Sequence, residues 1–255
     1  MKKGFGHRIT SYLRWRNRSV SWQSIHSPWL FELLVSMRSQ HHRDDEIERL
    51  RERLLRDPRR VPSVDFGAGS QGDIRTVKGI AQSSLKRPKH AQALAALAHH
   101  IGARRILELG TSLGTTAAYL ARQDRQVWTL EGNPHLGQLA TMHWKELKLE
   151  TITCVVGEFG QTLEGVLETA GPFDLVFIDG NHRGQALESY VGQVLPHLSP
   201  EGVVVCDDIH WSDDMEAGWN RVTAAPQWTL MVDFYEWGLL TRNPNLAREL
   251  KAVRF

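Results

Sequence analysis

From residue 104 onward, apolar runs of strand length alternate with longer segments of helical character. The apolar runs read "RILEL", "VWTLE", "ITCVVGE", "FDLVFID" and "GVVVCDD". Strands that are apolar along nearly their whole length are typical of a parallel sheet with helices on both faces. The pattern therefore predicts an α/β fold with a Rossmann-like, doubly wound, mostly parallel sheet. At its C-terminal end we expect an antiparallel hairpin in "WTLMVDFYEWGLLT", with the turn at 236–238, and a last edge strand in "LKAVRF".

The N-terminal third of the chain has a different texture, which predicts a helical appendage. "HSPWLFELLVSMRS" is typical of a helix with Ser27 as its N-cap and Pro28 in its first turn. "DDEIERLRERLLRD" predicts a second helix, with acids at its start and arginines towards its end. We divide the chain into a helical cap or appendage, residues 1–88, and an α/β domain, residues 89–255.

Composition restricts the classes of protein to which the chain can belong. Its 255 residues are 41% hydrophobic and 24% charged, with a net charge of +2, which is too small to indicate a nucleic-acid partner. No apolar run approaches the roughly 20 residues of a membrane span, and "MKKGFGHRIT" lacks the apolar centre of a secretory signal. Cys154 and Cys206 lie in apolar runs, as buried thiols do. We expect a cytoplasmic protein.

The first 31 residues contain basic and aromatic side chains but no acid before Glu32. The basic residues are Lys2, Lys3, Arg8, Arg14, Arg16 and Arg18. Four interpretations stay open at this point. The segment is a solvated basic face, receives an anionic substrate, makes peripheral contact with an anionic membrane surface, or builds a homodimer.

Two stretches, "VDFGAGSQGD" at 64–73 and "RILELGTSLGTT" at 105–116, place an acid just ahead of closely spaced glycines. A nucleoside site needs a strand that ends in glycines, a helix that starts there, and an acid at the end of the next strand. The second stretch meets all three conditions, with Gly110 and Gly114 in the loop and Glu131 after "VWTL". The first stretch fails them, and we interpret it as a glycine turn or as a lid over the ligand.

Each predicted parallel strand ends at or near an acid. These acids are Glu108, Glu131, Glu158, Asp179, and the pair Asp207 and Asp208. Ligands of open α/β sheets bind at the carboxyl ends of the strands. A row of carboxylates disfavours a pyrophosphate and suits a ligand with a ribose diol, an amine and a sulfonium cation.

Residues 89–220 resemble the class I S-adenosylmethionine (SAM) methyltransferases, in particular the small metal-dependent O-methyltransferases of the catechol and caffeoyl-CoA type. The resemblance is carried by "RILELGTSLGTTAAYLA", "LEGNPHLGQLA", "FDLVFIDGNHRGQALESY" and "LSPEGVVVCDDIHW". It implies that Glu108 and the loop hold the methionine part of SAM, that Glu131 binds the ribose hydroxyls, and that Glu158 lies near the adenine. The implied cofactor-binding set is Glu108, Gly110, Thr111, Ser112, Gly114, Glu131, Gly132, Glu158 and Asp179.

The same resemblance implies a divalent cation, Mg²⁺ or another, held by Asp179, Asp207 and Asp208, since hard cations prefer carboxylate oxygens. This chain departs from the branch in two places. It has Asp208 where the branch has asparagine, and His182 where the branch has a lysine base. Histidine acts as a general base near neutral pH, so Asp179 and His182 are the predicted catalytic residues. His210 is a second candidate.

The sequence thus predicts methyl transfer from SAM to a small-molecule acceptor, on an oxygen atom. Alternatives from other classes are a metal-independent N-methyltransferase, a transferase that uses a derivative of SAM, and a non-catalytic SAM-binding module. Trp211, beside the acidic pair, is the candidate wall for a planar or apolar part of the substrate.

Overall fold

The computed structural model describes residues 3–39, 44–62 and 75–254. The glycine-rich stretch 64–73, which we interpreted as a turn or a lid, lies outside the described residues. The chain forms two compact units, one of residues 1–38 and 172–255, the other of residues 39–171. The functional boundary expected at residue 88 stays a prediction.

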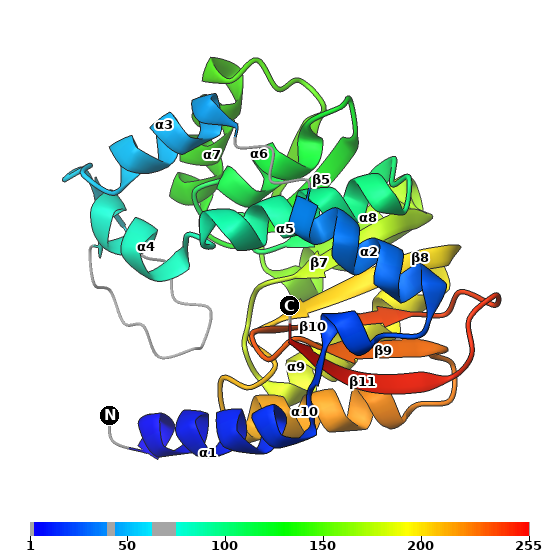
Figure 1. Ribbon diagram of the computed structural model, residues 1–255. Coiled ribbons are helices and arrows are strands. Elements are labelled where there is room, and N and C mark those ends of the chain that lie inside the picture. The colour runs from blue at the N-terminus through cyan, green and yellow to red at the C-terminus, as the bar shows by residue number, and fades with distance from the viewer. Residues whose placement is uncertain (1–2, 40–43, 63–74, 255) are drawn as a thin grey trace. The chain divides into compact units, whose positions relative to one another are not determined.

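In the unit of residues 39–171, parallel strands carry the predicted glycine loop and the acid that follows it. The strands pair in the order β4–β5–β6, with bounds β4 Arg105–Leu109, β5 Gln126–Glu131 and β6 Ile152–Val156. A helix follows each strand along the chain: α6 Thr115–Ala121, α7 Pro134–Glu146 and α8 Phe159–Ala170. These elements form the green part of the ribbon (Figure 1). They place Gly110 just after the carboxyl end of β4 and Glu131 at the carboxyl end of the neighbouring strand β5.

The other helices of this unit precede β4 in the chain. They are α3 Asp45–Leu54, α4 Val77–Ser84 and α5 Pro88–His100, and a small antiparallel pair is made by β2 Arg60–Val61 and β3 Arg75–Thr76. Asp44 caps α3, because its side chain accepts hydrogen bonds from the backbone N–H groups of Glu46 and Ile47. The helix predicted from "DDEIERLRERLLRD" is therefore present, and its first acid is its cap.

The unit of residues 1–38 and 172–255 contains a mixed sheet in the order β1–β11–β9–β10–β8–β7. Its strands are β1 Val20–Ser21, β7 Phe173–Ile178, β8 Leu198–Asp207, β9 Leu230–Asp233, β10 Trp237–Thr241 and β11 Glu249–Arg254. Its helices are α1 Lys3–Arg18, the 3₁₀ turns η1 Trp22–Ser24 and η2 Leu195–His197, α2 Pro28–Ser39, α9 Gly184–Val194 and α10 Asp213–Ala224. β7 and β8 run parallel, whereas β10 runs antiparallel to both β8 and β9.

The fold class is confirmed, and two details of the C-terminal region differ from the prediction. The antiparallel hairpin is present, but its turn is at 234–236, earlier than the expected 236–238. β11 is not an edge strand, because it pairs in parallel with β9 on one side and with β1 on the other. β1 has only two residues, Val20 and Ser21, so it has no alternating pattern that a sequence reading could detect.

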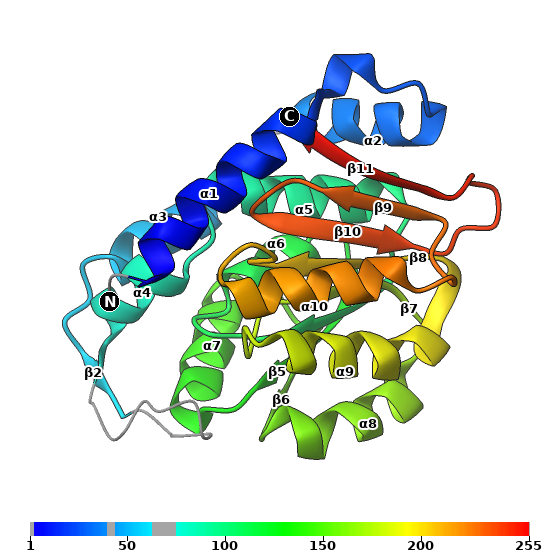
Figure 2. The ribbon, with the colours of Figure 1, turned by 90° about the horizontal axis from the view of Figure 1, so that it is seen from below.

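Close contacts at glycines bring the helices of this unit onto each other and onto the sheet. α9 and α10 lie side by side (Figure 2). A Cβ atom at Gly218 would come within 2.5 Å of the Cα atom of Gly184, and one at Gly238 within 2.3 Å of the ring of Trp219. Trp219 is buried beneath this contact. These glycines therefore fix how closely α10 packs.

Cys154 and Cys206 are both free thiols, and Cys206 is buried. Within the described part of the chain, none of the helices combines the length and the apolar character that crossing a bilayer requires.

Candidate cofactor site and acid–histidine cluster

The loop between β4 and α6 has a backbone that favours glycine. Gly110 has φ 111° and Gly114, the N-cap of α6, has φ 78°, both in the left-handed region. A Cβ atom at Gly114 would also come within 2.8 Å of the Cβ of Ala140 and of the indole nitrogen of Trp144. Ser112 adopts φ 50° without being a glycine, a conformation that clusters at ligand-binding sites. The loop thus presents bare backbone, as close approach of a ligand needs.

Helix α7 holds this loop from behind. The indole N–H of Trp144 donates to the carbonyl of Gly114 at 2.7 Å, and Nδ1 of His143 lies 3.0 Å from the carbonyl of Leu113. Because a carbonyl only accepts, Nδ1 of His143 carries a proton. Burial lowers the pKa of His143, which favours the neutral ring with its proton on that nitrogen. The shape of the loop is therefore set by two contacts that come from well beyond it in the sequence.

Glu131 ties the end of β5 to the same loop. One carboxylate oxygen accepts the backbone N–H of Ser112 at 2.7 Å, and the other accepts that of Asn133 at 2.9 Å. Burial raises the pKa of Glu131, and the two backbone hydrogen bonds oppose that rise. A carboxylate oxygen has more than one lone pair, so both oxygens retain acceptor capacity for hydroxyl groups. Glu131 is thus where the sequence predicted it, in contact with the glycine loop.

Glu108, just ahead of the loop, is completely buried, and one of its two carboxyl oxygens lacks a hydrogen-bond partner among the described residues. Its Oε2 accepts the hydroxyl of Thr129 at 2.6 Å, whereas its Oε1 has no hydrogen-bond partner among the described residues. The hydroxyl of Thr129 in turn lies 2.6 Å from that of Thr111. Burial raises the pKa of Glu108 to about 8. A buried polar atom without a partner is costly in a folded protein, so this oxygen fits a missing ligand.

Thr129 was not predicted as a site residue. The only signal in the sequence is a polar residue within the apolar run "VWTLE". Gly132 follows β5 in a half-buried bend, next to Glu131. Glu158 is the exposed N-cap of α8, and its side chain makes no cap hydrogen bond. The cofactor roles of Gly132 and Glu158 stay predictions.

Asp179, His182 and Asp208 lie together in the other unit. Nε2 of His182 is 3.9 Å from a carboxylate oxygen of Asp179 and 3.9 Å from one of Asp208. Asp179 directly follows β7 and Asp208 directly follows β8, so two adjacent parallel strands position the carboxylates. Asp208 has φ 54° and its backbone N–H donates to the carbonyl of Glu236 at 2.7 Å. The predicted catalytic pair is therefore brought together, with Asp208 as a third member of this acid–histidine cluster. Whether Asp179 also binds the cofactor stays a prediction.

The carboxylates that were predicted to hold a metal ion are not gathered into one ligand group in the described part of the chain. Among the residues that the structure describes, no three His, Cys, Asp or Glu side chains form a group that could hold a metal. Asp207 is buried at the last position of β8, and the Asp179 and Asp208 carboxylates both approach His182 instead. A divalent cation at these residues stays a prediction.

His210 has a different environment from His182. Its Nδ1 lies 3.0 Å from the hydroxyl of Ser11, and its Nε2 lies 3.0 Å from a carboxylate oxygen of Asp233. Since both ring nitrogens are engaged and the side chain is buried, we assign His210 to the attachment of α1 and not to proton transfer. Trp211, the candidate wall, is 49% exposed.

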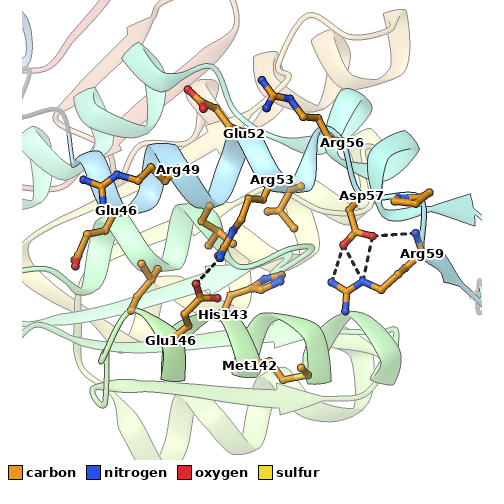
Figure 3. Close-up of a pocket in the computed structure, with 14 residues that line it drawn as sticks. Glu46, Arg49, Glu52, Arg53, Arg56, Asp57, Arg59, Met142, His143 and Glu146 are labelled. Carbon is orange, nitrogen blue, oxygen red and sulfur yellow. Dashed lines mark hydrogen bonds and ion pairs between the residues drawn. The ribbon is translucent and has the colours of Figure 1, made fainter.

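A pocket of about 970 Å³ lies between α3 and α7, in the unit that holds the glycine loop (Figure 3). Its walls carry ion pairs, Arg53 with Glu146 and Arg59 with Asp57, each at 2.6 Å. None of the predicted cofactor or catalytic residues lines it. Because these charges already neutralise one another, we assign the pocket no part in cofactor binding.

Comparison with known proteins agrees with this geometry. A family model described as a methyltransferase domain matches residues 107–209. One curated relative is the protein-L-isoaspartate O-methyltransferase of Dinoroseobacter shibae, 32% identical over 111 residues, which cover 42% of this chain and 46% of that protein. Another is the catechol O-methyltransferase of Mycobacterium tuberculosis, 32% identical over 120 residues, which cover 46% of this chain and 53% of that protein. The crystal structure of an O-methyltransferase from Bacillus cereus in complex with SAH shares the fold, with a TM-score of 0.55 at 22% identity over 62% of this chain and 82% of that one.

The matched region spans about half the length of these curated relatives. It contains the glycine loop, Glu131 and the acid–histidine cluster, and the structural likeness confirms the predicted fold. The family match over residues 107–209 and the shared fold are therefore both consistent with a class I SAM-dependent methyltransferase.

Proposed function

We propose that this chain transfers a methyl group from SAM to an oxygen atom of a small-molecule acceptor. The observation that carries the proposal is the contact of the glycine loop with Glu131, which accepts the backbone N–H of Ser112, together with a buried oxygen of Glu108, just ahead of the loop, that has no partner among the described residues. The relatives named above are both O-methyltransferases, which supports an oxygen acceptor.

The residues around the loop fit SAM by their chemistry. Glu131 offers acceptor oxygens for the two ribose hydroxyls. The loop from Gly110 to Ser112 offers backbone carbonyls to the amine of the methionine part, since its N–H groups already bond to Leu130 and Glu131. The buried Oε1 of Glu108 needs a donor, which a positively charged amine supplies. When bound, SAM supplies an activated methyl group on a sulfonium sulfur.

The acid–histidine cluster supplies the base in this proposal. Nε2 of His182 takes the proton from the acceptor hydroxyl as its oxygen forms a bond to the methyl carbon, and the bond from sulfur to that carbon breaks. S-adenosylhomocysteine leaves as the second product. The imidazolium that forms at His182 is stabilised by the carboxylates of Asp179 and Asp208, each 3.9 Å away. Proton transfer of this kind contributes about 10²–10⁴-fold to a rate.

Transfer of a labelled methyl group from SAM to a panel of catechols, phenols and carboxylic acids tests the proposal. We expect His182→Gln to lower turnover by roughly 10²-fold or more while SAM still binds, because the variant removes the base and leaves the loop intact. His197→Gln is the matched control, since His197 belongs to the separate turn η2, and it should keep full turnover. Equal turnover in wild type and His182→Gln would contradict the assignment of the base.

A further inference from the structure

Helix α1 is firmly attached along one face to the rest of its unit. The hydroxyl of Ser11 donates to a carboxylate oxygen of Glu216 at 2.9 Å, and the indole N–H of Trp15 donates to the carbonyl of Asp233 at 3.0 Å. Arg18 pairs with the carboxylate of Asp233 at 2.6 Å. Ser11 and Trp15 are buried, four residues apart on one side of the helix. α1 therefore behaves as a fixed part of this unit.

The outer face of the same helix carries apolar side chains. Ile9 is 47% exposed, Tyr12 is 45% exposed and Leu13 is 54% exposed. Ile9 and Leu13 are also four residues apart, so they lie next to each other on the side away from Ser11 and Trp15. Single exposed apolar residues are ordinary, but an adjacent pair with a tyrosine beside it, on a helix whose other face is already packed, indicates a contact surface.

The charges that α1 itself carries are all positive. Residues 1–31 contain no acid, and two of their cations have acidic partners elsewhere in the unit: Arg14 pairs with Glu216 at 3.2 Å and Arg18 pairs with Asp233. Arg16 has no acidic partner among the described residues. Arg8 stacks at 5.0 Å over the ring of Trp211, itself half exposed.

We propose that the outer face of α1, formed by Ile9, Leu13 and Arg16 and bordered by Arg8 and Tyr12, which also contact Trp211 and Tyr235, binds the surface of a membrane that contains anionic phospholipids. Such a surface accepts apolar side chains at the boundary of its acyl chains and holds arginines at its phosphates. Aromatic side chains such as Tyr12 and Trp211 are favoured at that depth. The contact is peripheral, and it goes beyond the methyl transfer proposed above.

Two other occupants explain the surface less well. A second copy of the chain would bring one positive face against another, and like charges repel. A nucleic acid would pair with the arginines but would leave Ile9 and Leu13 in water. An anionic lipid surface accommodates both the charge and the apolar side chains.

Co-sedimentation with lipid vesicles tests the proposal on the full chain. We expect little binding to phosphatidylcholine vesicles and clear binding when phosphatidylserine is included. The double variant Ile9→Ser/Leu13→Ser should bind those vesicles at least about tenfold more weakly, since it loses two buried apolar side chains. Arg16→Gln should weaken binding by about fivefold, and raised salt should narrow the difference between Arg16→Gln and wild type.

Leu250→Ser is the matched control, because Leu250 is an equally exposed apolar residue, 55% accessible, on strand β11 of the same unit. It should bind vesicles as the wild type does. Circular dichroism of each variant checks that the exposed substitutions leave the fold intact. The proposal is overturned if the wild-type protein does not bind anionic vesicles, or if the double variant binds them as strongly as the wild type. A double variant whose only change, by sedimentation velocity, is from dimer to monomer also overturns it, since that result assigns the face to a second copy.

Discussion

At the scale of single residues, the candidate site depends on a carboxyl group that the fold buries and only partly satisfies. Glu108 receives one hydrogen bond, from Thr129, and keeps one oxygen unpaired. Burial raises its pKa to about 8, from an ordinary value of 4.5, and the hydrogen bond from Thr129 opposes that rise. Such a group suits an enzyme that binds a cationic amine, because the amine donates the missing hydrogen bond and brings a positive charge.

The first prediction concerns the pH dependence of stability without cofactor. Because the pKa of Glu108 is higher in the folded state, the folded state holds a proton there that the unfolded chain releases above its own pKa. The contribution of Glu108 to the free energy of unfolding is therefore full below about pH 4.5 and is lost as the pH rises towards about 8.

Between pH 5 and pH 8 the wild type should lose more free energy of unfolding than Glu108→Gln, because glutamine cannot titrate. The difference, measured by urea denaturation, should be on the order of 1 kcal/mol or more. Glu158→Gln is the control, since Glu158 is an exposed carboxyl group that follows β6, a parallel strand of the same sheet. If Glu108→Gln and wild type showed the same pH slope, the raised pKa would be wrong.

At the scale of elements, the close approach of α9 and α10 fixes the turn between β8 and α10. A Cβ atom at Gly218 would come within 2.5 Å of backbone atoms of Gly184, which cannot move aside as a flexible side chain would. The backbone N–H of Gly184 also donates to the carboxylate of Asp214 at 2.7 Å. The loop that carries Asp208 leads directly into α10.

We therefore predict that Gly218→Ala lowers the free energy of unfolding by roughly 1–3 kcal/mol, the usual cost of an overpacked contact. Gly192→Ala on α9 is the matched control, because a Cβ atom at that position would meet no other atom within 4 Å. It should raise stability by up to about 1 kcal/mol through helix propensity. Thermal and urea denaturation of both variants give the comparison, and equal effects of the two substitutions would contradict the close contact.

Elements with a strong local signal were the ones that the sequence predicted. The apolar parallel strands, the glycine loop and the cap Ser27 follow from residues that are near one another in the chain. What the sequence did not reveal is set by long-range contact: the two-residue strand β1, the inner position of β11, and the hold of Trp144 on the loop. The clustering of His182 with Asp179 and Asp208 was expected, whereas a metal-ligand group with Asp207 was not found among the described residues.

At the scale of the whole molecule, the family region takes its parts from both compact units. Residues 107–209 include β4 to β6 of one unit and β7 and β8 of the other. The residues proposed to bind SAM and the acid–histidine cluster thus belong to separate units, and the methyl transfer proposed above uses residues of both. The other segments, α1 among them, lie outside the family match.

Removal of metal ions tests the proposed chemistry at this scale. Because His182 takes the proton itself in our proposal, turnover should be unchanged after treatment with EDTA. Readdition of Mg²⁺ to the treated protein is the control. Turnover that disappears with EDTA and returns with Mg²⁺ would instead support the cation that the family resemblance predicted at Asp179, Asp207 and Asp208.

The central claim is that the loop 110–114 and Glu131 bind one SAM molecule, and isothermal titration calorimetry with SAM tests it most directly. We predict that wild type binds one equivalent, and that Glu131→Ala loses about 1–3 kcal/mol of binding free energy because hydroxyl groups and the Ser112 N–H are left unpaired. Glu164→Ala, a change on helix α8, should bind as wild type does. Unaltered SAM affinity in Glu131→Ala, or no binding of SAM to wild type, would contradict the account.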